Sequence, residues 1–437
     1  MRKQLEKFFA TEAAGSTIRR EIMAGVTTFI TMAYIIAVNP AILAAAGIPP
    51  GPSMTATIVT AVVGTLIMGF YANRPFAIAP YMGENAFVAY TVVRVLGYRW
   101  ETALGAVFIA GAMLAVLTIG RVRRWIIEAI PQSLNHAFGA GIGLFLAFIG
   151  LNEAGIVTVG APGAPVQVGN LTAAPAQIAI AGFVLIAILM AYRVRGAILI
   201  GILSAATIAF LTGVARAPDG WIGAPPNPAP IFLKLDLRGA LGAGSLQILM
   251  PIFVMALVDT MGSLIGVSSR ANFLDDRGML PEIERPMLAD AIATMTAGLV
   301  GTTTAGAFIE SAAGIEAGGR TGLTAVVVAG LFLVAMFFAP IIGAIPAAAC
   351  APALIVVGAM MLPCAAKIDF SDLTESIPAF TVISLMSFTY NLGLGIAAGL
   401  LLYPALKTAT GRWSEVRPGM WLLFGLSALF FAVYPYR

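Results

Sequence analysis

The stretch GTTTAGAFIESAAGIEAGG, residues 301–319, places a carboxylate, Glu310, among threonine, alanine and glycine with almost no aliphatic bulk. The β-branched residues before Gly306 favour a short extended segment, and the residues after it are compatible with a helix. Within a membrane, non-helical backbone is tolerated only where protein or a water-lined cavity satisfies its polar groups. In a membrane protein, this stretch would therefore be a short strand followed by a half-helix near the centre.

The composition is that of a membrane protein. Of the 437 residues, 59% are hydrophobic and 11% are charged, and the mean hydropathy is +0.93, whereas globular domains are about half apolar and about a quarter charged. Residues 22–73, 321–366 and 376–406 contain no charged side chain, and spans need about 20 apolar residues each. The net charge of +4 lies mostly in short loops, so it informs topology and does not indicate nucleic-acid binding.

The hydrophobic pattern predicts an all-α polytopic membrane protein with fourteen transmembrane segments. A further apolar stretch, residues 420–433, is either another span or a tail lying along the membrane. The charged, amphipathic N-terminus does not resemble a cleavable signal peptide. The fourteen segments are residues 22–46, 54–71, 76–97, 101–119, 130–151, 173–192, 196–214, 244–267, 286–302, 304–318, 320–340, 345–365, 375–391 and 392–409.

The basic residues predict an orientation with the N-terminus in the cytoplasm of a cell whose inner (plasma) membrane the chain crosses many times. RVRR at 121–124, YRVR at 192–195 and the loop from Arg270 to Arg285 then also fall inside. The longer loops, 152–172 and 215–243, fall outside. Arg94 and Arg99 depart from this pattern.

A second stretch, RPFAIAPYMGENAFVAYTVV at 74–93, also combines an extended start with a half-helix. Gly83-Glu84-Asn85-Ala86 aligns with Ile309-Glu310-Ser311-Ala312, and the two stretches are the third and tenth segments. A repeat of seven spans inverts its second copy, so the pattern predicts two inverted halves, 7+7. Interrupted segments at matching places in two halves indicate a transporter's substrate site.

The ionisable residues within the predicted spans are candidates for function, because each costs at least ~2.5 kcal/mol near a bilayer centre. They are Glu84, Asp259, Asp290, Glu310 and His136. Glu310 is the strongest candidate, because a half-helix start offers free N–H groups and a positive dipole end. For Asp259 and more so Asp290, capping a broken helix or pairing with an arginine stays an alternative. A single histidine is more often a packing residue than a proton relay.

No enzyme constellation is present in the sequence. One histidine cannot build a multi-histidine metal site, the two cysteines, Cys350 and Cys364, lie in apolar surroundings, and no phosphate-binding glycine-lysine motif occurs. We expect no enzyme activity, no metal and no cofactor.

Four stretches together resemble one family of transporters. They are MAYIIAVNPAIL (32–43), APYMGENAFVAYTVV (79–93), DTMGSLIGV (259–267) and FIESAAGIEAGGRTGLTAVV (308–327). They are similar to the AzgA-like guanine/hypoxanthine and adenine permeases of the nucleobase–cation symporter and nucleobase–ascorbate transporter group. The resemblance extends from about Leu5 to Arg412.

The resemblance implies a core domain (segments 1–4 and 8–11) and a gate domain (segments 5–7 and 12–14). In residues, these are 1–120 with 244–340 and 121–243 with 341–437. It also implies proton-coupled purine uptake by an elevator-like movement, in homodimers joined through their gate domains. The family's ligands fall on Asp259, Glu310, Asn85 and Asp290. Relatives often carry an apolar residue where this chain has Glu84, which puts the substrate range in doubt.

The chemistry of a purine agrees with these residues. A 6-oxopurine presents N1–H and guanine adds a 2-amino group, so an ionised carboxylate accepts two parallel hydrogen bonds. Our hypothesis makes Glu310 the main nucleobase ligand and Asp259 a second ligand or the coupling proton site, with Asp290 as a further proton-coupling candidate. Asn85, Glu84 and Ser311 complete the expected frame, and Phe308 and Phe87 are candidates to stack on the ring.

Other functions remain open at this point. A uracil, xanthine or small-anion carrier of the same fold is the nearest alternative, and a passive channel or membrane receptor is a more distant one. The sequence ranks neither guanine against adenine nor one conformational state against another.

Overall fold

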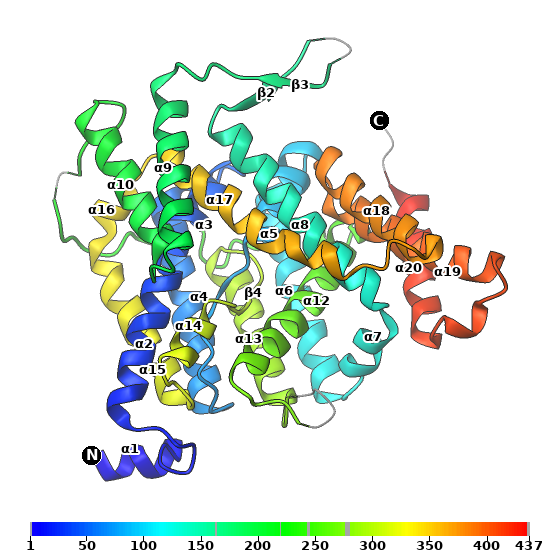
Figure 1. Cartoon of the computed structure of the whole chain (residues 1–437), viewed down its shortest axis with the longest axis horizontal. Helices are drawn as coiled ribbons and strands as arrows, with labels where there is room; N and C mark the ends of the chain where they lie inside the picture. Colours follow the sequence, from blue (N-terminus) through cyan, green and yellow to red (C-terminus); the bar gives the residue numbers. More distant parts are fainter. Residues whose placement is uncertain (1, 162–163, 219, 243–244, 276–279, 435–437) are drawn as a thin grey trace.

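The computed structural model describes residues 2–161, 164–218, 220–242, 245–275 and 280–434 (Figure 1). Each of the fourteen predicted segments coincides with a helix or with an interrupted helix. Among the described residues, nine helical stretches are long and apolar enough to cross a membrane, and three shorter apolar helices accompany them. The chain is thus an all-helical, multi-pass membrane protein apart from two small strand pairs.

The first half of the chain supplies helices on both sides of one interrupted segment. An amphipathic helix, α1 (Arg2–Phe9), precedes the spans. The helices that follow are α2 (Ile18–Met32), α3 (Ile35–Ala44), α4 (Pro50–Phe70), α6 (Trp100–Ile119), α7 (Arg123–Ala129), α8 (Gln132–Glu153), α9 (Ala174–Ala191), α10 (Ala197–Leu211) and the short α11 (Leu237–Ala240).

The second half repeats this arrangement of long helices around another interrupted segment. Its helices are α12 (Leu246–Arg270), α13 (Glu284–Val300), α15 (Gly322–Ala335), η2 (Met336–Phe338), α16 (Ala339–Gly343), α17 (Ala347–Met361), η3 (Leu362–Lys367), α18 (Leu373–Phe388), α19 (Leu392–Ala409), η4 (Trp413–Glu415) and α20 (Pro418–Val433).

The sequence predicts a short strand in each interrupted segment, and in the structure the two segments also meet through these strands. Strand β1 (Ile78–Pro80) leads into α5 (Met82–Ala86) and the π-helix η1 (Phe87–Val95), and strand β4 (Ala305–Ala307) leads into α14 (Ser311–Glu316). The strands pair antiparallel, with Ala79 opposite Gly306, and all six strand residues are buried. Because this pairing satisfies much of the extended backbone, both half-helices can start deep inside the protein.

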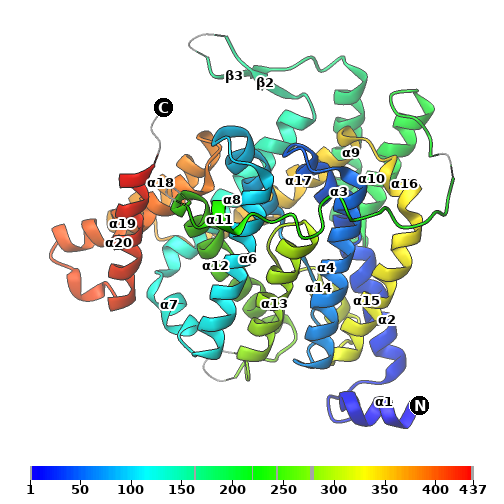
Figure 2. The ribbon, with the colours of Figure 1, turned by 180° about the vertical axis from the view of Figure 1, so that it is seen from behind.

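The long helices pack in two sets. One set surrounds the paired strands: α13 lies against α6 and α4, and α15 lies against α4 and α2. In the other set, α17 packs on α8 and α9, and α18 packs on α8 and α19. Figure 2 shows α18 and α19 of the second set at one side of the molecule, and α2, α4 and α15 of the first set at the other. The sequence assigns the first set to the core domain and the second to the gate domain, and this division stays a prediction.

The turn into β4 depends on a glycine. Gly301 ends α13 with a φ of 102°, in the left-handed region, where residues other than glycine are strained. A Cβ at this position would also lie 2.7 Å from the Ile231 side chain. The reversal that brings residues 302–307 back beside β1 therefore depends on this glycine.

Two parts of the fold were not predicted, and a third was left open between a span and a tail along the membrane. The loop at 152–172 contains a strand pair, β2 (Val157–Val159) with β3 (Val166–Val168), and α7 precedes the fifth segment. The stretch at 420–433 forms α20, which packs on α19, α12 and α7. Its 16 residues extend about 24 Å at 1.5 Å per residue, less than the bilayer's ~30 Å hydrocarbon core.

A buried carboxylate joins α2 to the start of α15. Glu21 is fully buried, and it accepts hydrogen bonds from Arg320 N at 3.0 Å, Thr321 N at 3.2 Å and Thr324 Oγ1 at 2.6 Å. Two of these donors are backbone N–H groups at a helix start, where the helix supplies no acceptor. Glu21 therefore caps α15 from a different helix.

We expect Glu21→Ala to destabilise the protein by about 2–4 kcal/mol, because the substitution leaves buried donors without acceptors. The measurement is the thermal unfolding midpoint of the purified protein in detergent. Glu12→Ala, at an exposed position near the N-terminus, is the matched control and should leave the midpoint unchanged. Equal midpoints for the two variants would show that Glu21 does not hold α15.

Candidate functional site

A cavity of about 200 Å³ lies where the half-helices face the second set of helices. Its polar lining comes from Tyr34, Tyr81, Asp259, Ser263 and Glu310. The opposite wall is apolar and is formed by α8 and α17, through Ile142, Leu146, Val357, Met360 and Met361. We call this cavity the central pocket. It combines a few convergent polar groups with an apolar wall, as small-molecule sites do.

Glu310 lies at the N-cap position of α14. Its Oε1 accepts a hydrogen bond from the Tyr34 hydroxyl at 2.5 Å, and its own carbonyl lies 3.5 Å from Thr31 Oγ1. Tyr34 itself lies in the turn between α2 and α3, and it is 1% exposed. One carboxylate oxygen is thus fixed by a buried hydroxyl, which orients the carboxylate at the edge of the pocket.

Asp259 and Glu84 form a pair of adjacent carboxyl groups on the other side of the pocket. Asp259 lines the pocket, and Glu84 is fully buried and near enough to Asp259 for the two carboxyl groups to influence each other electrostatically. Neither oxygen of Glu84 has a hydrogen-bond partner of ordinary geometry. Placing one negative charge on two adjacent carboxyl groups costs less free energy than placing a negative charge on each of them.

Two aromatic rings line the pocket with nearly parallel planes. The rings of Tyr81 and Phe308 are inclined by 7°, and their centroids lie 6.2 Å apart. The Tyr81 hydroxyl passes so close to Gly306 that a Cβ there would lie 2.2 Å from the hydroxyl oxygen. Glycine at 306 therefore allows the Tyr81 ring to lie against β4 and beside Phe308.

The structure brings some of the predicted residues into the pocket and leaves others behind its wall. Asp259, Phe308 and Glu310 line it. The remaining candidates, Glu84, Asn85, Phe87, Ser311 and Asp290, are buried and are not part of its lining. Their predicted roles in binding and proton coupling stay predictions.

Each of these remaining residues has a place in the packing around the strands. Ser311 Oγ accepts from Ala77 N at 3.0 Å. The side-chain atoms of Asn85 are buried without a hydrogen-bond partner, and Phe87 is fully buried in η1. His136 is partly buried at the start of α8.

Asp290 is hydrogen-bonded to the backbone of strand β4. Its Oδ2 accepts from Ala307 N in β4 at 3.3 Å, and its Oδ1 is buried without a hydrogen-bond partner. Arg123, also fully buried, donates to Met287 O at 3.0 Å. Whether Asp290 pairs with an arginine or takes part in proton coupling stays a prediction.

Sequence reasoning missed Tyr34, Tyr81 and the apolar wall. Tyr34 and Tyr81 both lie within the stretches that carry the family resemblance, and both are next to breaks in secondary structure. For Tyr81, its position beside a predicted break was the available signal, whereas Tyr34 lies within the predicted segment 22–46 and gave none. Ile142 and Met360 gave no such signal, because an apolar residue in a span looks the same whether it faces lipid, protein or a pocket.

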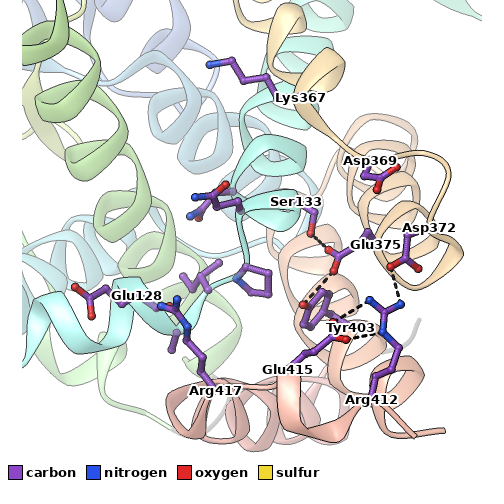
Figure 3. Close-up of a pocket in the computed structure, with 15 residues that line it drawn as sticks. Glu128, Ser133, Lys367, Asp369, Asp372, Glu375, Tyr403, Arg412, Glu415 and Arg417 are labelled. Carbon is purple, nitrogen blue, oxygen red and sulfur yellow. Dashed lines mark hydrogen bonds and ion pairs between the residues drawn. The ribbon is translucent and has the colours of Figure 1, made fainter. Parts of the chain in front are cut away.

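A larger cavity of about 680 Å³ lies among α8, α18, α19 and the loop after α19 (Figure 3). Its charges largely satisfy one another. Lys407 Nζ, fully buried, lies 2.7 Å from Glu375 and 2.9 Å from Glu415, and Arg412 pairs with Asp372 at 2.7 Å.

Hydrogen bonds from Arg412 and Lys407 lower the pKa of Glu415 to about 2. Hydrogen bonds from Thr374 and Arg412 hold the pKa of Asp372 well below its usual range. These ion pairs and hydrogen bonds join the start of α18 to the end of α19 and the loop that follows it.

The geometry defines a class of protein. A polytopic helical protein with two half-helices meeting beside a carboxylate-containing pocket is a membrane transporter. Within the part of the chain that the structure describes, no three His, Cys, Asp or Glu side chains gather as metal ligands.

Comparison with known proteins identifies the family. Residues 19–400 match the model of the permease family. The chain is 39% identical to the adenine permease AdeP of Escherichia coli, covering 95% of this chain and 93% of AdeP. It is 40% identical to the guanine/hypoxanthine permease PbuO of Bacillus subtilis, covering 95% and 97%. A putative permease of Methanocaldococcus jannaschii is 45% identical, covering 98% and 97%. The chain belongs to the permease family, and it is a transporter and not an enzyme.

Solved structures share the fold at low sequence identity. The transmembrane domain of the cyanobacterial bicarbonate transporter BicA aligns with a TM-score of 0.63 at 16% identity, covering 87% of this chain and 97% of that one. The murine anion transporter Slc26a9 in its inward-facing state aligns with a TM-score of 0.64 at 11% identity, covering 90% and 68%. The arrangement of helices seen here is thus the fold of these transporters.

Proposed function

We propose that the protein takes up a purine nucleobase, guanine/hypoxanthine or adenine, together with protons. The observation that carries this proposal is the lining of the central pocket, a carboxylate and a second carboxyl group beside two parallel aromatic rings. The identity of about 40% to adenine and guanine/hypoxanthine permeases over almost the whole chain supports it.

The proposed contacts follow from the donors of the base. Glu310 accepts hydrogen bonds from N1–H and, for guanine, from the 2-amino group, while Tyr34 holds the carboxylate in place. Tyr81 and Phe308 offer flat apolar surfaces to the planar ring. Asp259 is the second ligand or the coupling proton site, with its proton shared with Glu84.

The movement we propose is elevator-like, with inverted halves of seven segments each. The core domain, residues 1–120 and 244–340, carries the half-helices, and the gate domain, residues 121–243 and 341–437, supplies the apolar wall. The apolar wall formed by Ile142, Leu146, Val357 and Met361 supports this proposal. These side chains offer no hydrogen bond that a sliding movement would have to break. Two copies associate through their gate domains in the plasma membrane, with the N-terminus in the cytoplasm.

An anion carrier of the same fold is the second candidate, and the pocket disfavours it. Among the described residues that line the central pocket, two are acidic and none is basic. An inorganic anion would therefore meet negative charge where it needs cations or N–H donors.

Uptake into proteoliposomes tests the function. With an imposed pH gradient, radiolabelled hypoxanthine, guanine or adenine should accumulate above its equilibrium concentration, and collapsing the gradient should abolish the accumulation. Uracil and bicarbonate serve as comparison substrates. Preference for uracil or bicarbonate would favour another carrier of this fold, and equilibration without accumulation would indicate a passive pathway.

A further inference from the structure

A second cavity, of about 430 Å³, lies on the far side of Glu310 from the central pocket. Thr31, Arg193 and Arg195 contribute to its lining, so we call it the arginine cavity. Three residues line both cavities: Ile309, Glu310 and Met360. The central pocket and the arginine cavity therefore meet at these three side chains.

Two of the shared residues are apolar and come from different sets of helices. Ile309 directly precedes α14, and Met360 lies in the last turn of α17. Their exposed fractions are 55% and 48%, although apolar side chains between two packed sets of helices are usually covered. Both side chains therefore border open space where the two cavities meet.

The arginine cavity differs from the central pocket in its chemistry. Arg193 and Arg195 flank the turn between α9 and α10, and Glu316 on α14 joins them in the lining. Charged side chains of both signs favour a water-filled space. The same arginines belong to a short basic loop, which the positive-inside rule assigns to the cytoplasm.

We propose that Ile309 and Met360 form an apolar gate between the central pocket and the arginine cavity, and that the bound nucleobase leaves to the cytoplasm between them. The inference rests on the proposed function, because it needs a nucleobase in the central pocket. Ile309 moves with the half-helix and Met360 with the opposite wall, so sliding of one set of helices against the other narrows or widens the passage. The bulk of the two side chains then sets how fast the base is released.

The gate residues act on release more than on affinity, since neither offers the base a hydrogen bond. Met360→Trp should slow exchange of radiolabelled hypoxanthine across proteoliposomes at least tenfold while changing the binding constant much less. Ile309→Trp should act in the same way from the other side. Met360→Ala should have the opposite effect and speed dissociation of the base at least threefold.

The controls separate this inference from the proposed function. Val334→Trp adds the same bulk at a position on α15 that is 55% exposed and lines neither cavity, and its exchange rate should match that of the unaltered protein. If the unaltered protein binds no purine, the proposed function fails. If it binds and exchanges purine, but Met360→Trp and Met360→Ala exchange at its rate, the gate is wrong and the function stands. Loss of affinity in parallel with exchange would make Met360 a part of the binding site and would also overturn the gate.

Discussion

Replacing Glu310 by glutamine is expected to reduce purine uptake at least about 100-fold. Removing one partner of a buried, charged hydrogen bond costs about 2–5 kcal/mol of binding free energy. Glutamine has the same shape, but it presents one acceptor and one donor in place of two acceptors. A base offering two parallel donors would keep one hydrogen bond and face an N–H group with the other. The measurement is initial uptake of guanine and hypoxanthine in proteoliposomes, with binding measured in detergent.

Glu284→Gln is the matched control for this substitution. Glu284 is exposed in the first turn of α13 and lines neither cavity, so the same change of charge there should leave uptake within twofold. The difference between guanine and adenine is informative as well, since adenine lacks the N1–H donor. If Glu310→Gln transports guanine with unchanged kinetics, Glu310 is not the nucleobase ligand.

The positions of the spans could be predicted because a membrane imposes a long apolar stretch on every crossing. The two interrupted segments could also be predicted, since Pro75, Pro80 and the run of threonines before Gly306 disfavour a continuous helix. The antiparallel contact between β1 and β4 was not predicted, because it joins two segments that lie far apart in the sequence. Short-range sequence features therefore predicted the positions of the spans and of the two breaks.

The pocket was less predictable, because its lining depends on packing between segments far apart in the sequence. Glu310 and Asp259 were identified since an unpaired acid in a span needs an explanation. Tyr34 is joined to Glu310 across 276 residues of chain, and nothing around Tyr34 distinguishes it from a packing residue. Glu21 looked like a charge in a cytoplasmic loop, yet it is fully buried as the cap of α15.

A sequence pattern also does not predict which neighbouring element a buried side chain faces. Glu84 and Asn85 are neighbours on the same half-helix, but only Glu84 lies against Asp259. In a five-residue helix such as α5, consecutive residues point about 100° apart. One residue can therefore face the pocket region while the next faces the surrounding helices.

Asp259→Asn is expected to uncouple uptake from the pH gradient, and this is the second large effect. At about 4 Å and an effective dielectric constant of 20, two like charges repel by about 4 kcal/mol. Our proposal therefore gives the pair formed by Asp259 and Glu84 one shared proton, which avoids this repulsion. Removing one acid removes that repulsion and with it the shared proton. Uptake measured with and without an imposed gradient should then become equal, at a rate at least about tenfold below normal.

A double-mutant cycle with Glu84→Gln decides whether the two acids act as one unit. Because the carboxyl groups influence each other electrostatically, the combined variant should be no slower than Asp259→Asn alone, whereas independent residues would have multiplicative effects on rate. Asp236→Asn, with its side chain at the start of α11, is the control for loss of an aspartate elsewhere and should retain the gradient dependence. Multiplicative losses in the double variant, or full gradient dependence in Asp259→Asn, would place the coupling proton elsewhere, and Asp290 and Glu310 would then be the acids to replace next.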